Sequence, residues 1–202
     1  MKLYYSPGAC SMSPHIVMRE AGIPVQLVKV DLGAKKTEDG TDFRTLNGKG
    51  YVPTLELPDG QRLTEGPAIV QYLADQVPTS GLAPASGTIE RYRLQEWLNF
   101  ISTELHKQFS PLFDPACEST LKARQIQRIG GRLDWISKQL GNREYLLGSH
   151  FTVADAYLFT VLSWSGHVGI DLAKWPALAA YVGRIRERPQ VREALKAEGL
   201  LK

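Results

Sequence analysis

Cysteine is scarce in this sequence of 202 residues, which contains two thiols, Cys10 and Cys117. Their separation fits neither a disulfide framework nor a metal-ligand spacing, so we expect two reduced thiols and no metal site. No apolar run approaches the roughly 18 to 20 residues that cross a bilayer, and the first residues lack the pattern of a signal peptide. We therefore expect a soluble, cytoplasmic protein.

Clustered charge is also missing. The formal net charge is +3, and the 24 Lys and Arg residues are spread along the chain instead of forming basic runs. Nucleic-acid binding requires a concentrated basic surface, so no nucleic acid is expected among the partners. By contrast, 43% of the residues are hydrophobic, which suffices for two compact domains with cores of their own.

The first 80 residues alternate between strand and helix patterns. Strands are predicted at 2–6, 25–30, 54–57 and 61–64, and helices at 14–21 and 67–74. The strand-helix-strand order predicts a parallel pair of strands, whereas Pro58-Asp59-Gly60 predicts a tight turn between two later strands. The sequence thus predicts an α/β domain over residues 1–80.

A second domain is predicted to be all helical. Residues 77–87 are rich in Pro, Gly and Ser, which is typical of a linker. Beyond them apolar residues recur at helical spacing, with a helix predicted from Ile89 to about Leu112, so residues 87–202 form the second predicted domain. Thr152-Val153-Ala154-Asp155 is a capping box, which starts an apolar helix and contributes no chemistry.

Two neighbouring motifs predict a site for a short acidic peptide. In Tyr51-Val52-Pro53-Thr54-Leu55, the proline holds Val52 extended, and a cis bond would leave Val52 with a free N–H and C=O for an incoming peptide. Ordinary entry into a strand is the alternative interpretation. In Thr64-Glu65-Gly66-Pro67, the proline suits the first turn of a helix that opens at Gly66, and its unpaired N–H groups can hold a carboxylate.

Cys10 lies in a loop, Ser6 to Pro14, that leads from the first strand into the first helix. The positive end of the helix favours a thiolate there, although a lone cysteine is more often inert packing. The spacing Cys10-x-x-Ser13 is also found in thiol–disulfide enzymes with one cysteine.

These motifs resemble the glutathione-binding half of the glutathione transferases, and the Cys10 loop is similar to that of the bacterial beta class. The resemblance implies a thioredoxin-like domain followed by a helical domain, with glutathione as a co-substrate and no permanently bound cofactor. It also implies a homodimer that transfers the glutathione thiolate to an aromatic or halogenated electrophile. One position departs from the family, which usually has a hydroxyl residue where Gly66 stands.

The resemblance also implies roles for individual residues. Asn99, Thr103 and His106 stand at i, i+4 and i+7, which predicts one polar stripe on a helix. Tyr5 and Ser13 are reserve candidates for activating the thiol. The expected catalytic residues are Cys10, Ser11 and His106. The expected glutathione-binding residues are Cys10, Lys35, Val52, Pro53, Glu65, Gly66, Asn99, Thr103, His106 and Lys107. The expected electrophile pocket consists of Phe109, Phe113, Tyr157, Trp164 and Val168.

Two alternatives stay open from the sequence. A glutathione-dependent thiol transferase or dehalogenase would use Cys10 as a nucleophile, and the Cys10-x-x-Ser13 spacing favours it. A non-enzymatic protein that keeps the fold and binds apolar ligands is the other, and Gly66 is the feature that points to it.

Overall fold

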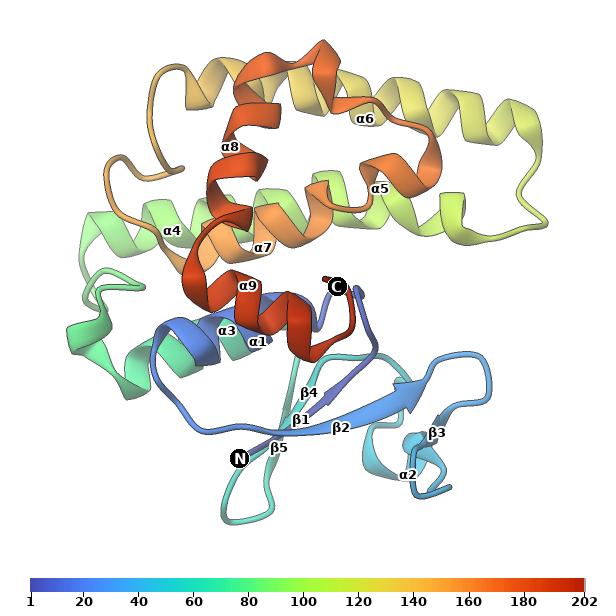
Figure 1. The fold of residues 1–202 in the computed structure, drawn as a ribbon, viewed down its shortest axis with the longest axis vertical. Helices are drawn as coiled ribbons and strands as arrows, with labels where there is room; N and C mark the ends of the chain where they lie inside the picture. The colour runs from blue at the N-terminus through green and yellow to red at the C-terminus, as the bar shows by residue number, and fades with distance from the viewer. Residues whose placement is uncertain (202) are drawn as a thin grey trace. The chain divides into compact units, whose positions relative to one another are not determined.

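The computed structural model describes residues 1–201, which divide into two compact units (Figure 1). One unit contains Met1–Ala83 and residues 187–201, and the other contains Pro84–Arg186. The predicted limits, 1–80 and 87–202, differ from these units at the C-terminal end, because the last helix groups with the first unit.

The first unit is built on a mixed five-stranded sheet in the order β3-β2-β1-β4-β5. The strands are β1 (Lys2–Tyr5), β2 (Gln26–Asp31), β3 (Lys36–Thr37), β4 (Thr54–Glu56) and β5 (Arg62–Thr64). As predicted, β1 and β2 are parallel and β4 and β5 form an antiparallel hairpin. The central strand β1 pairs antiparallel with β4 and brings Tyr4 opposite Thr54.

Helices α1 (Met12–Glu20), α3 (Gly66–Gln76) and α9 (Pro189–Ala197) lie above the sheet in Figure 1, and α1 packs against both others. Leu3 and Leu55 of the sheet, Ile16 of α1 and Leu73 of α3 are fully buried. Helix α1 starts two residues before the predicted Pro14, since proline is tolerated in a first helical turn. Strand β3 and the short α2 (Phe43–Leu46) were not predicted.

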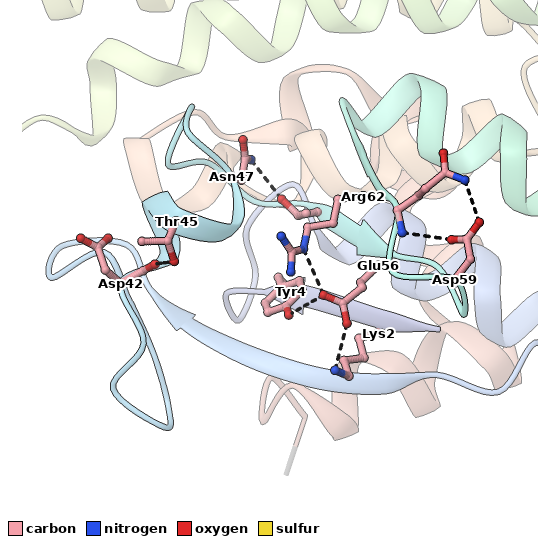
Figure 2. A network of polar contacts seen from close by, with 10 residues as sticks. Lys2, Tyr4, Asp42, Thr45, Asn47, Glu56, Asp59 and Arg62 are labelled. Atoms are coloured by element: carbon pink, nitrogen blue, oxygen red, sulfur yellow. Dashed lines mark hydrogen bonds and ion pairs between the residues drawn. The ribbon is translucent and has the colours of Figure 1, made fainter.

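Glu56 on β4 connects three neighbours on the sheet (Figure 2). Its carboxylate accepts hydrogen bonds from Lys2, at 2.9 Å, from Tyr4, at 3.1 Å, and from Arg62, at 3.0 Å. The Lys2 ammonium above all lowers the pKa of Glu56. This charged cluster ties β1, β4 and β5 together.

A buried hydrogen bond explains why the C-terminal end belongs to the first unit. Glu198 and His15 Nδ1 of α1 share a hydrogen bond of 2.8 Å, and both side chains are fully buried. The second oxygen of Glu198 accepts the Gly8 N–H at 2.9 Å. A buried polar group is costly without a hydrogen-bond partner, so these bonds hold the chain end on α1.

The second unit is helical, as predicted, through its described residues 84–186. Its elements are α4 (Ile89–Phe100), a π-helical segment η2 (Ile101–His106), α5 (Lys107–Phe109), η3 (Ser110–Phe113), α6 (Ser119–Leu140), α7 (Val153–Leu162), η4 (Ser165–Val168), η5 (Leu172–Lys174) and α8 (Pro176–Arg186). The predicted helix from Ile89 to about Leu112 is present as a helical stretch without a break, but a π-helical segment and a final 3-10 turn, which were not predicted, form part of it.

Every residue of α7 is buried, and the helix contacts α4, η2 and α8. The predicted capping box is present at its start. Asp155 accepts hydrogen bonds from Thr152 N, Leu146 N and the Tyr181 hydroxyl at 2.8 to 2.9 Å. Burial raises the pKa of the Asp155 carboxyl, and these bonds oppose the shift. Across the described residues, the helices are too short or too polar to span a membrane.

Candidate active site

The thiol of Cys10 lies at the start of α1 and contacts the peptide-docking motif. Its Sγ donates a hydrogen bond to the Val52 carbonyl at 3.1 Å, and neither Cys10 nor Cys117 forms a disulfide. The sequence separates Cys10 and Val52 by 42 positions, so the fold brings together the thiol loop and the Val52–Pro53 loop. A thiol and an extended backbone segment therefore share one corner of the first unit.

The two serines near Cys10 use their hydroxyls elsewhere. Ser11 is fully buried, and its hydroxyl donates to the Ser6 carbonyl at 3.2 Å and accepts from the Ser6 N–H at 3.1 Å. The Ser13 hydroxyl donates to the Cys10 carbonyl at 2.9 Å. Both side chains fix the shape of the thiol loop, while the predicted hydroxyl contact from Ser11 to the thiol stays a prediction.

The Val52–Pro53 peptide bond is cis, which is the conformation that the docking hypothesis requires. Val52 is buried and packs with Tyr4, Val30 and Phe43 under the loop. Asn47, also buried, braces the loop. Its Nδ2 donates to the Thr54 hydroxyl at 3.0 Å, the dashed line at Asn47 in Figure 2, and to the Tyr51 carbonyl at 2.8 Å.

Glu65 and Gly66, for which an anion site is predicted, lie at the start of α3. Glu65 adopts a left-handed backbone conformation, with φ of 70°, which is rare for a residue with a side chain. Its carboxylate is exposed and pairs with the Lys49 ammonium at 2.6 Å. A Cβ at Gly66 would lie 4.0 Å from Pro53 and from the Ser13 hydroxyl, which is ordinary contact.

The Lys35 side chain contacts the loop that contains Gly50, Tyr51 and Val52. Its ammonium donates to the Gly50 carbonyl at 3.0 Å and lies 5.3 Å from the centre of the Tyr51 ring. Tyr5, a reserve candidate for thiol activation, has a raised pKa, because of its burial first and then of the carboxylates of Glu198 and Glu38.

In the second unit the predicted residues gather in one aromatic cluster around Trp164. The ring of Trp164 lies 4.9 Å from His106, 5.8 Å from Phe109 and 5.8 Å from Phe113, each distance measured between ring centres. His106 Nδ1 shares a hydrogen bond of 2.7 Å with the Tyr157 hydroxyl. Five predicted site residues thus lie together. They come from η2, α5, η3, α7 and the residues just after α7.

Exposure separates the members of this cluster. Phe109 is fully buried and Tyr157 is 2% exposed, whereas Phe113 is 49% exposed. Val168 on η4 is half-buried and Lys107 on α5 is exposed. Phe109 and Tyr157 therefore form the buried side of the cluster. Among the residues that the structure describes, the Phe113 ring is partly exposed to solvent.

The predicted polar stripe on one helical face was wrong, because η2 widens the helical turn between its members. Asn99 and Thr103 are exposed, and the Thr103 hydroxyl donates to the Asn99 carbonyl at 3.0 Å. His106, by contrast, is half-buried and bonds Tyr157. The π-helical segment thus directs His106 into the aromatic cluster and away from the exposed pair.

Sequence reasoning missed two residues of the peptide-docking region, Asn47 and Lys49. The Asn47-Gly48 pair is a turn signal that indicates a loop here. Nothing in the local sequence indicates that the Asn47 side chain reaches Thr54, or that Lys49 reaches Glu65, 16 positions away. Both contacts depend on the fold.

Family models decide the identity. Residues 8–76 match the model of the glutathione S-transferase N-terminal domain, and residues 119–184 match the model of the glutathione S-transferase C-terminal domain. The chain belongs to the glutathione S-transferase family. It is 48% identical to the glutathione S-transferase GstA of Escherichia coli O157:H7 over 99% of this chain and 100% of that protein.

Solved structures of glutathione S-transferases agree. A ternary complex of the bacterial transferase BphK is 59% identical, with a TM-score of 0.97 over 99% of this chain and 100% of that one. A sphingomonad glutathione S-transferase complexed with glutathione is 52% identical, with a TM-score of 0.96 over 99% and 100%. A beta-class transferase from Sphingomonas chungbukensis is 51% identical over both full chains, with a TM-score of 0.97.

These likenesses confirm the predicted resemblance to the bacterial beta class, the thioredoxin-like and helical fold and the transferase class. Glutathione is the co-substrate of glutathione S-transferases, as predicted.

Proposed function

We propose that the protein transfers the thiolate of glutathione to an electrophilic aromatic or halogenated small molecule, with Cys10 beside the glutathione sulfur. The observation that carries the proposal is the 3.1 Å contact between Cys10 Sγ and the Val52 carbonyl. If the cysteinyl backbone of glutathione pairs with Val52, as an added strand does, its sulfur enters the region of the Cys10 thiol.

Binding begins with an exchange at Val52. The N–H of the incoming cysteinyl residue donates to the Val52 carbonyl, which in the structure accepts from the Cys10 thiol. The Cys10 thiol is then released to donate toward the glutathione sulfur. A hydrogen bond to the charged form favours a thiolate, and each unit by which the pKa of that thiol falls corresponds to about 1.4 kcal/mol.

The outer parts of glutathione are assigned to the charged groups of the same loops. Glu65 and the Gly66 N–H hold the γ-glutamyl end, and Lys35 pairs with the glycyl carboxylate. The Lys35 ammonium contacts the loop before Val52 through its hydrogen bond to the Gly50 carbonyl, which supports the assignment. Lys107 is the second candidate for that carboxylate.

His106 is assigned to proton transfer, because imidazole titrates near neutral pH. Its hydrogen bond to Tyr157 fixes the ring and one of its nitrogens. Trp164, Phe113 and Val168 are assigned to binding the electrophile, with Phe109 and Tyr157 behind them.

The assembly and location are also proposals. We propose a homodimer in which the exposed Asn99 and Thr103 reach glutathione bound to the neighbouring subunit. Sedimentation as a monomer in analytical ultracentrifugation would remove both residues from the site. A cytoplasmic location is proposed because reduced glutathione and reduced thiols are maintained in that compartment.

The test is the steady-state rate of glutathione conjugation to a chloronitrobenzene by the wild-type protein, Cys10→Ala and Cys117→Ala. Conjugation by the wild type supports the proposal, and we expect Cys10→Ala to lower kcat/KM by about tenfold or more. Cys117 lies in the loop before α6 and serves as the matched control with unchanged activity. Equal rates for all three proteins would overturn the assignment of Cys10.

A second candidate, thiol transfer through Cys10, rests on the same contact. The Cys10 thiolate attacks a mixed disulfide of glutathione docked at Val52, takes the glutathionyl group and releases the other thiol, and a second glutathione then frees Cys10 as glutathione disulfide. Intact mass spectrometry distinguishes the two. A Cys10–glutathione adduct that forms and is released at the turnover rate favours thiol transfer, whereas an adduct that never turns over favours conjugation.

A further inference from the structure

Lys49 faces the proposed γ-glutamyl subsite from the loop between α2 and β4. Its ammonium lies 2.6 Å from Glu65 Oε1 and 2.9 Å from the Thr64 hydroxyl. Glu65 is assigned to the γ-glutamyl end, whose α-ammonium is the group that a carboxylate pairs with, and in the structure Glu65 pairs with the Lys49 ammonium.

We propose that Lys49 is a specificity-determining residue of the γ-glutamyl subsite. The Lys49 ammonium, which pairs with Glu65 in the structure, pairs instead with the ligand's α-carboxylate when the ligand's α-ammonium takes its place on Glu65. This inference rests on the proposed function, because it takes glutathione as the ligand.

Charge balance supports the exchange. The γ-glutamyl end carries an ammonium and a carboxylate on the same carbon atom. Glu65 matches the ammonium, but Gly66 offers the carboxylate only a neutral N–H in place of the usual hydroxyl residue. Lys49 supplies the missing cation, and every charge has a partner both before and after the exchange.

Hydrogen bonds hold the Lys49 backbone, whereas its side chain lies at the surface. Its N–H donates to Asn47 Oδ1 at 3.1 Å, and the next carbonyl, of Gly50, accepts from Lys35 at 3.0 Å. The Lys49 and Glu65 side chains are 52% and 67% exposed. Exposed ion pairs contribute little to stability, so the ligand's own charges can displace this one.

The test uses calorimetric titration of the wild-type protein and Lys49→Gln with three peptides. These are glutathione, glutaryl-Cys-Gly, which lacks the α-ammonium, and γ-aminobutyryl-Cys-Gly, which lacks the α-carboxylate. We expect Lys49→Gln to weaken binding of glutathione by about fivefold to tenfold and binding of glutaryl-Cys-Gly by less, because Lys49 stays paired with Glu65 when no α-ammonium replaces it. Binding of γ-aminobutyryl-Cys-Gly should stay unchanged or tighten, because it has no carboxylate for Lys49 and Glu65 is freed.

Two further variants complete the design. Lys29→Gln removes the same charge from an exposed position on β2 and should leave all three affinities unchanged. Lys49→Arg keeps the charge and should retain most of the glutathione affinity.

The outcomes separate this inference from the function on which it depends. Wild-type protein that binds no glutathione overturns the proposed function and this inference with it. Wild-type binding with an unchanged affinity in Lys49→Gln overturns the inference alone. Equal weakening of all three peptides in Lys49→Gln also overturns it, since a damaged loop would affect them alike.

Discussion

The two units hold their candidate functional groups by different means. In the first unit, backbone atoms carry the site: the Val52 carbonyl contacts the thiol, and Asn47 braces the loop around it. In the second unit, side chains carry it, with His106 bonded to Tyr157 and packed on Trp164. A site made of backbone atoms depends on the shape of a few loops. A site made of side chains depends on a helical core that holds several rings in fixed positions. Substitutions should therefore act mainly on ligand affinity in the first unit and on stability or turnover in the second.

The largest effect is expected at Asp155, which supports the core of the second unit. Asp155→Ala leaves the Leu146 N–H and the Tyr181 hydroxyl without their buried acceptor. We expect the free energy of unfolding to fall by about 3 kcal/mol or more, measured by urea denaturation. Asp134→Ala, which removes an exposed acceptor of Trp175, is the control and should cost less than about 1.5 kcal/mol. A smaller loss at Asp155 than at Asp134 would contradict the comparison.

Asn47→Ala tests the brace of the backbone site. It removes two donated bonds, to the Tyr51 carbonyl and the Thr54 hydroxyl, in a buried position. We expect a stability loss of about 1 to 2 kcal/mol, and a Kd for glutathione that rises by about fivefold because Val52 is displaced. Thermal denaturation and calorimetry measure the two effects. Asn142→Ala, at an exposed position, should change neither, and an unchanged Kd in Asn47→Ala would refute the brace.

Tyr157→Phe probes the side-chain site without opening a cavity. It removes the hydroxyl that bonds His106 Nδ1 at 2.7 Å and retains the ring. We expect kcat for conjugation to fall by about threefold to tenfold while the glutathione Kd stays constant. The titration midpoint of the His106 imidazole, measured by NMR, should also change in this variant. Tyr92→Phe, on the exposed part of α4, is the control. A change in the glutathione Kd with a constant kcat would contradict a role of the Tyr157–His106 bond in turnover.

Gly66→Ser is expected to strengthen glutathione binding at the first unit's site by a small amount. The space around Gly66 accepts a Cβ, and the added hydroxyl can donate to the γ-glutamyl carboxylate. We expect the glutathione Kd to fall by about threefold. Gly66→Ala fills the same space without a hydroxyl, so an equal gain in both variants would attribute the effect to the backbone instead of the hydrogen bond.

The smallest effect concerns Asp42, which caps α2. The Arg44 side chain above all lowers the pKa of Asp42 to about 2, from an ordinary value of 3.8. Because this pKa is depressed in the folded protein, its contribution to stability is present above pH 3.8 and is lost as the pH falls toward 2. NMR titration of the Asp42 carboxyl should give a midpoint near 2, and Arg44→Gln should raise it. An ordinary midpoint in the wild type would contradict the ion pair.

Local chemistry explains which features the sequence could predict. The Pro58-Asp59-Gly60 turn, the cis Val52–Pro53 site and the start of α3 at Gly66 and Pro67 depend on residues that restrict their own backbone. The capping box at Thr152 is likewise a contact between near neighbours. The helix from Ile89 shows the limit of such reasoning, because apolar spacing did not reveal the π-helical segment before Lys107.

The sequence by itself determined the order of β1, α1, β2, β4, β5 and α3, the position of the thiol before α1 and the family to which the chain belongs. Each of these is encoded in short stretches whose residues act on their immediate neighbours. Only the tertiary structure decided that Glu198 pairs with His15, that Cys10 contacts Val52 and that Lys49 faces Glu65. Those contacts join residues from 16 to 183 positions apart, and burial and charge pairing across such separations act once the chain has folded.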